Sequence, residues 1–174
     1  MEQSIDVPWQ KMVVLLRRLQ AEPGYYAPRL TPERLAAAIQ ERRAVIRWCD
    51  GHIAAITVLW PTNRPDWMEL GTVWVGEGLR GRGLRNELMA EAVALAPNGV
   101  SLFLFSSVGK IMQSAISLRF EPMTTEKYRV LWWASEVGVV CRLPNSIHPM
   151  FIRGEGPFYR RPEKEGERWL FIRP

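Results

Sequence analysis

The segment from Val73 to Arg85, VWVGEGLRGRGLR, constrains the fold more than any other part of the chain. It begins with β-forming residues, continues through closely spaced glycines and leads into an amphipathic helical pattern over residues 83–96. A strand that turns through glycines directly into a helix is typical of a crossover to a parallel neighbour. The strongly apolar residues 100–105 are the expected neighbouring strand.

The same segment has the chemistry of an anion site. The first turn of a helix presents unpaired backbone N–H groups and the positive end of the helix dipole, and glycine lets an anion approach the backbone closely. Arg80, Arg82 and Arg85 crowd this turn, where the dipole disfavours cations, so they indicate an external polyanion. A solvated basic turn or an Arg-Gly nucleic-acid segment is the alternative. Neither a Walker loop nor a Rossmann fingerprint fits, because Gly-Lys-Ser/Thr is absent and Asn86 stands where a third glycine belongs.

Hydrophobic periodicity around this segment predicts an α/β fold. Strands close together in the chain favour an antiparallel N-terminal meander joined at Asp50-Gly51, and strands alternating with helices favour a parallel C-terminal part. We therefore expect one mixed sheet flanked by about four helices. The residues from 128 to 140 are predicted as either a further helix or a sixth strand. The expected helices are 6–22 (with Trp9, Met12 and Leu19 facing the core), 31–40, 83–96 and 108–118, and the expected strands are 44–49, 52–60, 67–75 and 100–105.

The proline- and glycine-rich tail is predicted to be an extension of this domain. We divide the chain into a domain over 1–143 and an extension over 144–174 that packs on it. Residues 158–161 and 169–172 carry large apolar side chains that must be hidden, so we expect a hairpin packed near Trp132 and Trp133. It would wall part of an acceptor site or form a homodimer contact.

Composition excludes several classes of function. The chain has 174 residues, 47% of them hydrophobic, and a formal net charge of +5, which suits one folded domain with an anionic ligand. Its apolar runs are too short to cross a bilayer and its start lacks the pattern of a secretory signal, so we expect a cytoplasmic protein. Cys49 and Cys141 are expected to be buried thiols, and His52 and His148 are too isolated to predict a metal site.

The motif Arg80-Gly81-Arg82-Gly83-Leu84-Arg85 resembles the Arg/Gln-x-x-Gly-x-Gly/Ala pyrophosphate loop of the GNAT superfamily of N-acetyltransferases. The order of elements is similar from about residue 6 to residue 122, and Arg119-Phe120 stands where the family often has Gly-Phe. The resemblance implies transfer of an acetyl group from acetyl-CoA to an amine acceptor. It implies that the coenzyme is bound by Trp74 and Val75 through their backbone N–H groups and by Arg80, Gly81, Arg82, Gly83, Leu84 and Arg85.

Resemblance to the family also suggests the remaining site residues. Glu69, eleven residues before Arg80, is the candidate catalytic base, with a solvent-facing glutamate as the alternative. Tyr25 and Tyr26 are candidate acceptor-binding residues, or else loop aromatics packed on the core. The family's tyrosine, a frequent general acid, falls on Ala115, and its asparagine falls on Val108. The acid is left open between Tyr128 and a water held by Ser106, Ser107 or Ser114.

Two other functions stay open at this point. The loss of the tyrosine at Ala115 favours a GNAT-like module that binds coenzyme A without turnover, as a sensor or scaffold. The arginine-rich loop and the tryptophans also suit a basic nucleic-acid-binding domain.

Overall fold

The structure is a computed structural model of the chain, and it describes residues 8–22, 30–62, 64–106 and 109–122 together with four short strands nearer the C-terminus. For residues 105–106 and all those beyond 120, only the backbone is described. In the described part no helix is long and apolar enough to cross a membrane.

Two helices begin the fold, α1 (Trp9–Gln20) and α2 (Pro32–Gln40). Helix α2 starts as its sequence predicts, because the Thr31 hydroxyl caps the helix by accepting the Arg34 N–H at 3.3 Å and Pro32 takes the first helical position. In α1, Met12, Leu15 and Leu19 are buried. Trp9 is 50% exposed, so the prediction that it faces the core is wrong. The buried stripe of α1, formed by Met12, Leu15 and Leu19, does not include Trp9.

An antiparallel meander follows, made of β1 (Ala44–Cys49), β2 (His52–Pro61) and β3 (Trp67–Val75). The β1–β2 connection is the two-residue turn predicted at Asp50-Gly51, where both residues have positive φ, 49° and 72°. This part of the fold therefore confirms the expected N-terminal half of the sheet.

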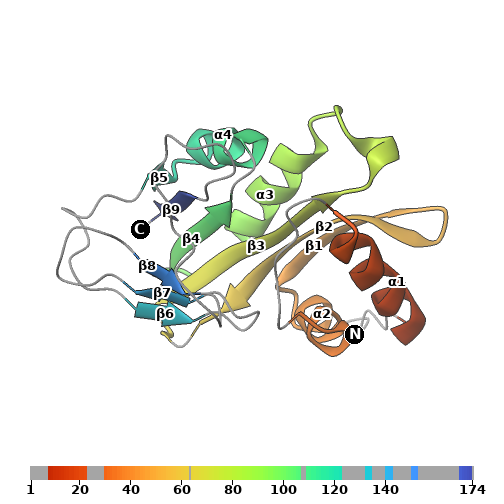
Figure 1. Ribbon diagram of the computed structural model, residues 1–174, viewed down its shortest axis with the longest axis horizontal. Coiled ribbons are helices and arrows are strands. Elements are labelled where there is room, and N and C mark those ends of the chain that lie inside the picture. The colour runs from red at the N-terminus through yellow and green to blue at the C-terminus, as the bar shows by residue number, and fades with distance from the viewer. Residues whose placement is uncertain are drawn as a thin grey trace.

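The crossover predicted after β3 is also present. A 3-10 turn, η1 (Glu77–Leu79), leads into α3 (Leu84–Ala94), then β4 (Ser101–Ser106) and α4 (Gly109–Ser117). Strand β4 lies parallel to β3, with Trp67 opposite Ser101 and Glu69 opposite Phe103. The mixed sheet with four flanking helices is thus confirmed, and the β3–α3–β4 connection carries the chain over one face of it (Figure 1).

The C-terminal strand completes the main sheet, whose order is β1-β2-β3-β4-β9-β5. Strand β9 (Trp169–Arg173) lies antiparallel between β4 and β5 (Glu121–Pro122). The other half of the expected hairpin, residues 158–161, lies outside the described residues. A second sheet holds β6 (Trp132–Ala134), β7 (Val140–Arg142) and β8 (Met150–Ile152), so the described parts of 128–140 are strands, one of the two alternatives predicted.

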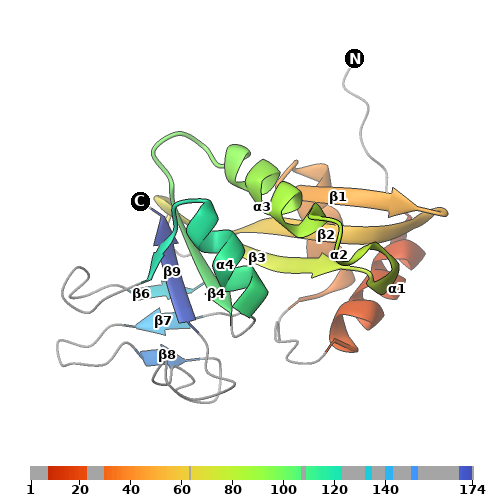
Figure 2. The same ribbon diagram turned by 90° about the horizontal axis from the view of Figure 1, so that it is seen from above.

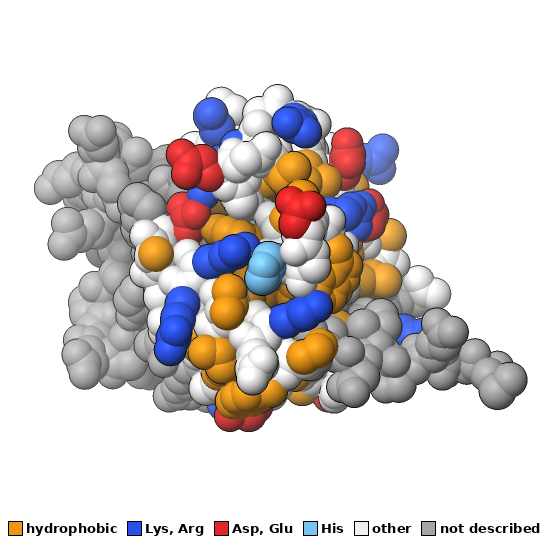
Figure 3. All heavy atoms as spheres, turned by 90° about the vertical axis from the view of Figure 1, so that its right-hand side faces the viewer, with side chains coloured by type: hydrophobic (Ala, Val, Ile, Leu, Met, Phe, Trp, Pro, Cys, Tyr) orange, Lys and Arg blue, Asp and Glu red, His pale blue; other side chains and the backbone are white. Residues whose placement is uncertain are grey.

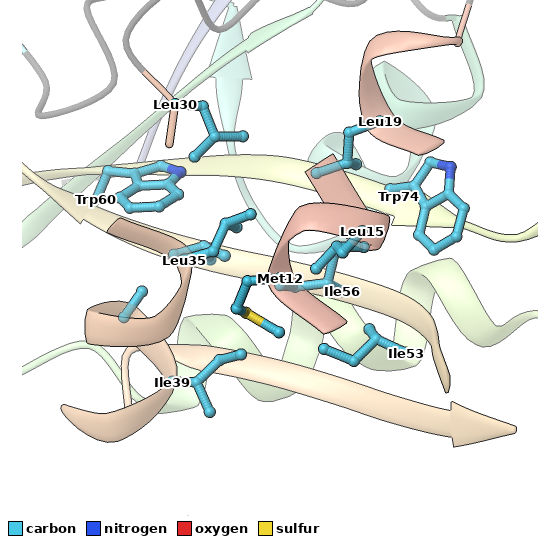
Figure 4. Close-up of a cluster of buried hydrophobic side chains, with 12 residues drawn as sticks. Met12, Leu15, Leu19, Leu30, Leu35, Ile39, Ile53, Ile56, Trp60 and Trp74 are labelled. Carbon is cyan, nitrogen blue, oxygen red and sulfur yellow. The ribbon is translucent and has the colours of Figure 1, made fainter. Parts of the chain in front are cut away.

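The main sheet separates two hydrophobic cores. Helices α1 and α2 cover one face and α3 and α4 cover the other, as two perpendicular views show (Figures 1 and 2). The first core gathers α1 and α2 side chains around Ile56, Trp60 and Trp74 (Figure 4). The second packs Leu88 and Met89 of α3 on the opposite face of the strands. Helices thus cover both faces of the sheet, and the turn after β3 leaves it at one end.

Candidate functional site

The turn between β3 and α3 contains two glycines with left-handed backbone conformations. Gly81 and Gly83 have φ of 81° and 78°, in the left-handed region that side chains disfavour. Among the described residues, no neighbouring atom lies within 4 Å of a Cβ built on Gly81, so they leave the space beside the backbone there open. Gly83 is the N-cap of α3, and no side chain of the described residues caps the helix. The first N–H groups of α3 therefore point into an open turn, as an anion site requires.

The three arginines of the turn have different surroundings. Arg80 is held internally, because its Nε donates to the Val75 carbonyl at 2.9 Å and its Nη2 forms an ion pair with Glu22. Arg82 is exposed and Arg85 is half-buried, and neither forms an ion pair with any residue in the described ranges. Arg82 and Arg85 therefore have their cationic groups available to an external anion.

This end of the molecule carries both charge signs. In Figure 1 the β1–β2 hairpin and the turn after β3 lie on the right-hand side, and Figure 3 faces that side. Basic side chains are spread over it, with acidic and hydrophobic side chains between them. The surface is thus not a continuous basic stripe of the kind that tracks a nucleic-acid backbone.

Strands β3 and β4 part midway along their length. Their pairing runs from Trp67 opposite Ser101 to Glu69 opposite Phe103. Beyond that point β3 keeps its partner β2 on the far side, and β4 pairs with β9 as far as Ser106. Within the described strands a fork therefore opens between two parallel strands, with Glu69 at its base and the turn after β3 at its mouth.

The backbone of Val75 faces this fork. In an antiparallel pair, successive residues point their N–H and C=O alternately toward and away from the partner strand. Gly76 donates its N–H to Ala54 of β2 at 2.8 Å, so Val75 points its backbone groups away from β2. Its carbonyl accepts Arg80 Nε on that side. The Val75 N–H therefore points into the fork, whereas the N–H of Trp74 points back to β2.

A β-bulge bends β3 within the fork. Ile56 lies opposite Trp74 and Val58 opposite Gly71, so two β3 residues face one β2 residue. One of these two is Thr72, whose φ of 51° is an outlier for a β-branched residue. Its hydroxyl accepts a hydrogen bond from Trp60 Nε1 at 2.9 Å, which holds the bulge in place.

Glu69 is a buried carboxylate at the base of the fork. Its side chain is on the same face as Trp60, its partner across the β2–β3 ladder, and the residue is only 5% exposed. A Cβ built on Gly71 would lie 3.2 Å from Glu69 Oε1 and 3.0 Å from the Trp60 ring, so glycine leaves the room that the carboxylate fills. The structure excludes the solvent-facing alternative for Glu69.

Comparison with known families gives this geometry a context. The model of the acetyltransferase (GNAT) family matches residues 13–115, which is more than half of the chain. The chain belongs to the GNAT acetyltransferase family. Among curated proteins none matches it at a significant level.

Two solved N-acetyltransferase structures share the fold. A ribosomal-protein-alanine N-acetyltransferase from Brucella melitensis is 15% identical with a TM-score of 0.56, and 96% of each chain is covered. A GNAT family N-acetyltransferase (YhbS) from Escherichia coli, solved in complex with CoA, is 14% identical with a TM-score of 0.51, covering 96% of this chain and 78% of that one. A longer chain from Pyrococcus horikoshii is 12% identical with a TM-score of 0.48, and the match covers 66% of the present chain. The present chain spans only 40% of the length of that protein.

Ala115, the position where the family resemblance places the tyrosine, lies in α4. Ala115 of α4 is fully buried in the second core. The neighbouring Ser114 hydroxyl is hydrogen-bonded to Asn86 of α3 and to the Lys110 carbonyl at 2.9 Å. Both hydrogen-bond partners of this hydroxyl are protein groups, and the bond to Asn86 joins α4 to α3. Ser114 is therefore a weaker candidate for holding a catalytic water.

Several residues of the predicted GNAT site lie outside the described residues, among them Tyr25, Tyr26, Tyr128, Ser107 and Val108.

The prediction that Cys49 is buried is wrong. Cys49 is exposed at the end of β1, with its Sγ 3.4 Å from Asp50 Oδ2. The hydrogen bond to Asp50 raises the pKa of this thiol. The side chain of Cys141 is not described. Within the described part of the chain, no group of His, Cys, Asp and Glu is arranged to hold a metal ion.

Sequence reasoning missed Glu22, Trp60 and Thr72. Gly71 inside a strand was a signal for a bulge, since glycine in a strand interior often marks one. Glu22 had no such signal, because its contacts with Trp74 and Arg80 span more than fifty residues of the chain.

Proposed function

We propose that the chain transfers an acetyl group from acetyl-CoA to an amine. The observation that carries the proposal is the uncapped N-terminus of α3, which lies at the mouth of the fork between β3 and β4. A polyanion at that helix start places the rest of an elongated coenzyme along the fork. Membership of the GNAT family supports acyl-CoA as the donor.

The diphosphate would be bound at the turn after β3. The N–H groups from Gly81 to Arg85 supply hydrogen-bond donors, and the side chains of Arg82 and Arg85 supply charge. Gly81 and Gly83 fit this role, because each has a positive φ and only a hydrogen where a side chain would point. The similar YhbS structure from Escherichia coli, solved in complex with CoA, supports the same ligand class.

The fork would bind the remainder of the donor. The Val75 N–H is the backbone donor that faces this space, and it would pair with an amide carbonyl of the coenzyme arm. Leu84, in the first turn of α3 and packed on the second core, would contribute an apolar contact at the mouth. Of the two strand N–H groups expected to bind, Trp74 is the weaker candidate, because its N–H points toward β2.

The chemistry requires an oriented donor and a neutral amine. The donor supplies an activated thioester. The acceptor nitrogen forms the new C–N bond as the C–S bond breaks, and the departing thiolate takes up a proton. Glu69, at the base of the fork, would accept the proton that the amine loses. Burial among Trp60 and Gly71 keeps this carboxylate out of bulk water, and orientation within the fork would supply further rate enhancement.

The acceptor is an amine of a small molecule or of a protein. The Brucella melitensis relative, described as a ribosomal-protein-alanine N-acetyltransferase, supports a protein amine as one choice. Tyr25 and Tyr26 would contact the acceptor, in keeping with the resemblance to the family.

A second candidate function is coenzyme A binding without turnover. The observation that favours it is in α4, where Ala115 is buried and the Ser114 hydroxyl is hydrogen-bonded within the protein. At the position where the resemblance places the thiolate-protonating tyrosine, this chain has the buried Ala115, which supports this candidate.

Titration of the purified protein with acetyl-CoA, followed by thiol release with a panel of amines, tests these proposals. We expect saturable binding and release of one thiol for each acetylated amine. Binding without thiol release for any amine would favour the second candidate. Absence of binding, with retention on DNA or RNA, would contradict both and favour the nucleic-acid alternative.

The loop itself is tested by Arg82→Glu. Replacing an exposed cation with a like charge against the diphosphate should weaken acetyl-CoA binding at least about tenfold, since hydrogen bonds to charged groups contribute about 1.5–3 kcal/mol. Isothermal titration calorimetry measures the change. Arg64→Glu is the matched control, because Arg64 precedes β3 at the end opposite the loop. Equal affinity in the two variants would show that the phosphates bind elsewhere.

A further inference from the structure

Glu22, the second residue after α1, connects the first helix to the turn after β3. Its Oε1 accepts a hydrogen bond from Trp74 Nε1 at 2.9 Å and also forms the ion pair with Arg80 Nη2. Trp74 is 8% exposed and belongs to the first core. One carboxylate oxygen thus joins a buried strand side chain to an arginine of the turn.

Arg80 is fixed in two directions by this arrangement. Its guanidinium is planar and presents its donors in a rigid fork. Nη2 points to Glu22, and Nε donates to the carbonyl of Val75 at 2.9 Å. The backbone of Arg80 is extended and leads directly into Gly81 at φ 81°. Holding the Arg80 side chain therefore fixes where the turn leaves β3 and where the N–H groups after it point.

We propose that Glu22 is a positioning residue of the coenzyme site, which rests on the function proposed above. It acts through Arg80 and Trp74 and need not touch the coenzyme. Its role is to hold Arg80 against Val75, so that the N–H groups of the turn and of the strand end face one ligand. Arg80 is then a positioning residue too, and Arg82 and Arg85 are the side chains that meet the phosphates.

A positioning role and a purely electrostatic role for Glu22 predict opposite changes in coenzyme affinity when the carboxylate is removed. A carboxylate close to a bound diphosphate repels it, and the repulsion is only partly screened over a few ångströms. If Glu22 acted only through its charge, neutralising it would strengthen coenzyme binding. If it positions the turn, removing it weakens binding, because the N–H groups lose their common direction.

The experiment measures the affinity for coenzyme A in Glu22→Ala and Glu22→Gln by calorimetry. Glu22→Ala removes both contacts, and we expect the Kd to rise about tenfold. Glu22→Gln keeps an oxygen that accepts from Trp74 and Arg80, so we expect a smaller rise. Glu77→Gln is the matched control, since Glu77 is an exposed carboxylate of η1 in the same turn. It should leave the affinity unchanged or increase it slightly.

The double variant Glu22→Ala/Arg80→Ala separates positioning from a general loss of stability. We expect it to bind coenzyme A about as weakly as Arg80→Ala alone, because the two residues act as one unit. Melting temperatures without ligand show whether each variant is folded, and Glu22→Gln serves if Glu22→Ala is not. If the wild-type protein binds coenzyme A and both Glu22 variants bind it equally or more tightly, the inference about Glu22 is overturned and the proposed function stands. A wild-type protein that does not bind coenzyme A would overturn the proposed function and this inference together.

Discussion

Arg119, the second residue after α4, is in the left-handed conformation, with φ of 65°. The Phe120 N–H bonds to the Ala115 carbonyl and the Arg119 N–H to the Ile116 carbonyl, each at 3.0 Å, which is the Schellman pattern of a helix end. Glycine usually occupies this position because a Cβ makes it strained. The Arg119-Phe120 pair, which stands where the family often has Gly-Phe, therefore carries a conformational cost.

Arg119→Gly should consequently stabilise the protein. Relief of a left-handed arginine is expected to raise the free energy of unfolding by about 1 kcal/mol, less the entropy that glycine adds to the unfolded chain. Thermal unfolding at fixed pH would show a Tm higher by roughly 2–4 °C. Arg119→Ala is the control, since it removes the side chain but keeps the Cβ. An equal gain in both variants would assign the effect to the lost charge and not to the backbone.

Glu69 offers the residue-scale test of chemistry. Glu69→Gln keeps the volume of the side chain against Gly71 and Trp60 but cannot accept a proton. If Glu69 is the base, turnover should fall about a hundredfold or more, which is the range for loss of one acid–base group. Steady-state kinetics with the best amine, alongside the Kd for acetyl-CoA, measures the effect. A fall in affinity with unchanged turnover would instead make Glu69 a structural residue.

At the scale of elements, local signals predicted most of what the structure shows. The Thr31 cap, the Asp50-Gly51 turn and the glycines of the β3–α3 turn each act within a few residues, so their consequences are readable in sequence. The uncapped helix start after Gly83 was predictable for the same reason. The Glu22–Arg80 pair, the internal use of Arg80 and the exposure of Cys49 depend on which elements meet in space. Periodicity alone does not determine those contacts.

The hydrogen bond that holds the β3 bulge can be tested by substitution of Thr72. Thr72→Val keeps the β-branched shape but removes the oxygen that accepts the Trp60 N–H, leaving a buried donor unpaired. We expect a loss of about 1–3 kcal/mol in the free energy of unfolding and a fall in turnover, since the bulge lies in the fork. Thr72→Ser retains the hydroxyl and should stay close to wild type in both. Denaturant unfolding and steady-state rates give the two readings, and a Thr72→Ser variant as impaired as Thr72→Val would rule out the hydrogen bond as the cause.

At the scale of the whole molecule, the last strand belongs to the central sheet. Strand β9 is hydrogen-bonded on both sides, to β4 over Leu102–Ser106 and to β5. The extension proposed over 144–174 therefore includes a strand that the domain over 1–143 would lack if it were cut off. One wall of the fork, β4, would become an exposed sheet edge.

Deleting residues 143–174 should accordingly yield a protein that aggregates or unfolds at a much lower temperature, because an unpaired apolar edge strand pairs with other chains. A single substitution separates the strand from the rest of the tail. Leu170→Pro removes a backbone donor within β9 and should destabilise the protein by about 1–3 kcal/mol, the cost of leaving a buried ladder group unpaired, whereas Leu170→Val keeps that donor and should cost far less. Size-exclusion chromatography and thermal unfolding measure both effects. A truncated chain that stays monomeric and melts at the same temperature as the full-length protein would show that β4 does not need β9 and that the fork forms without the tail.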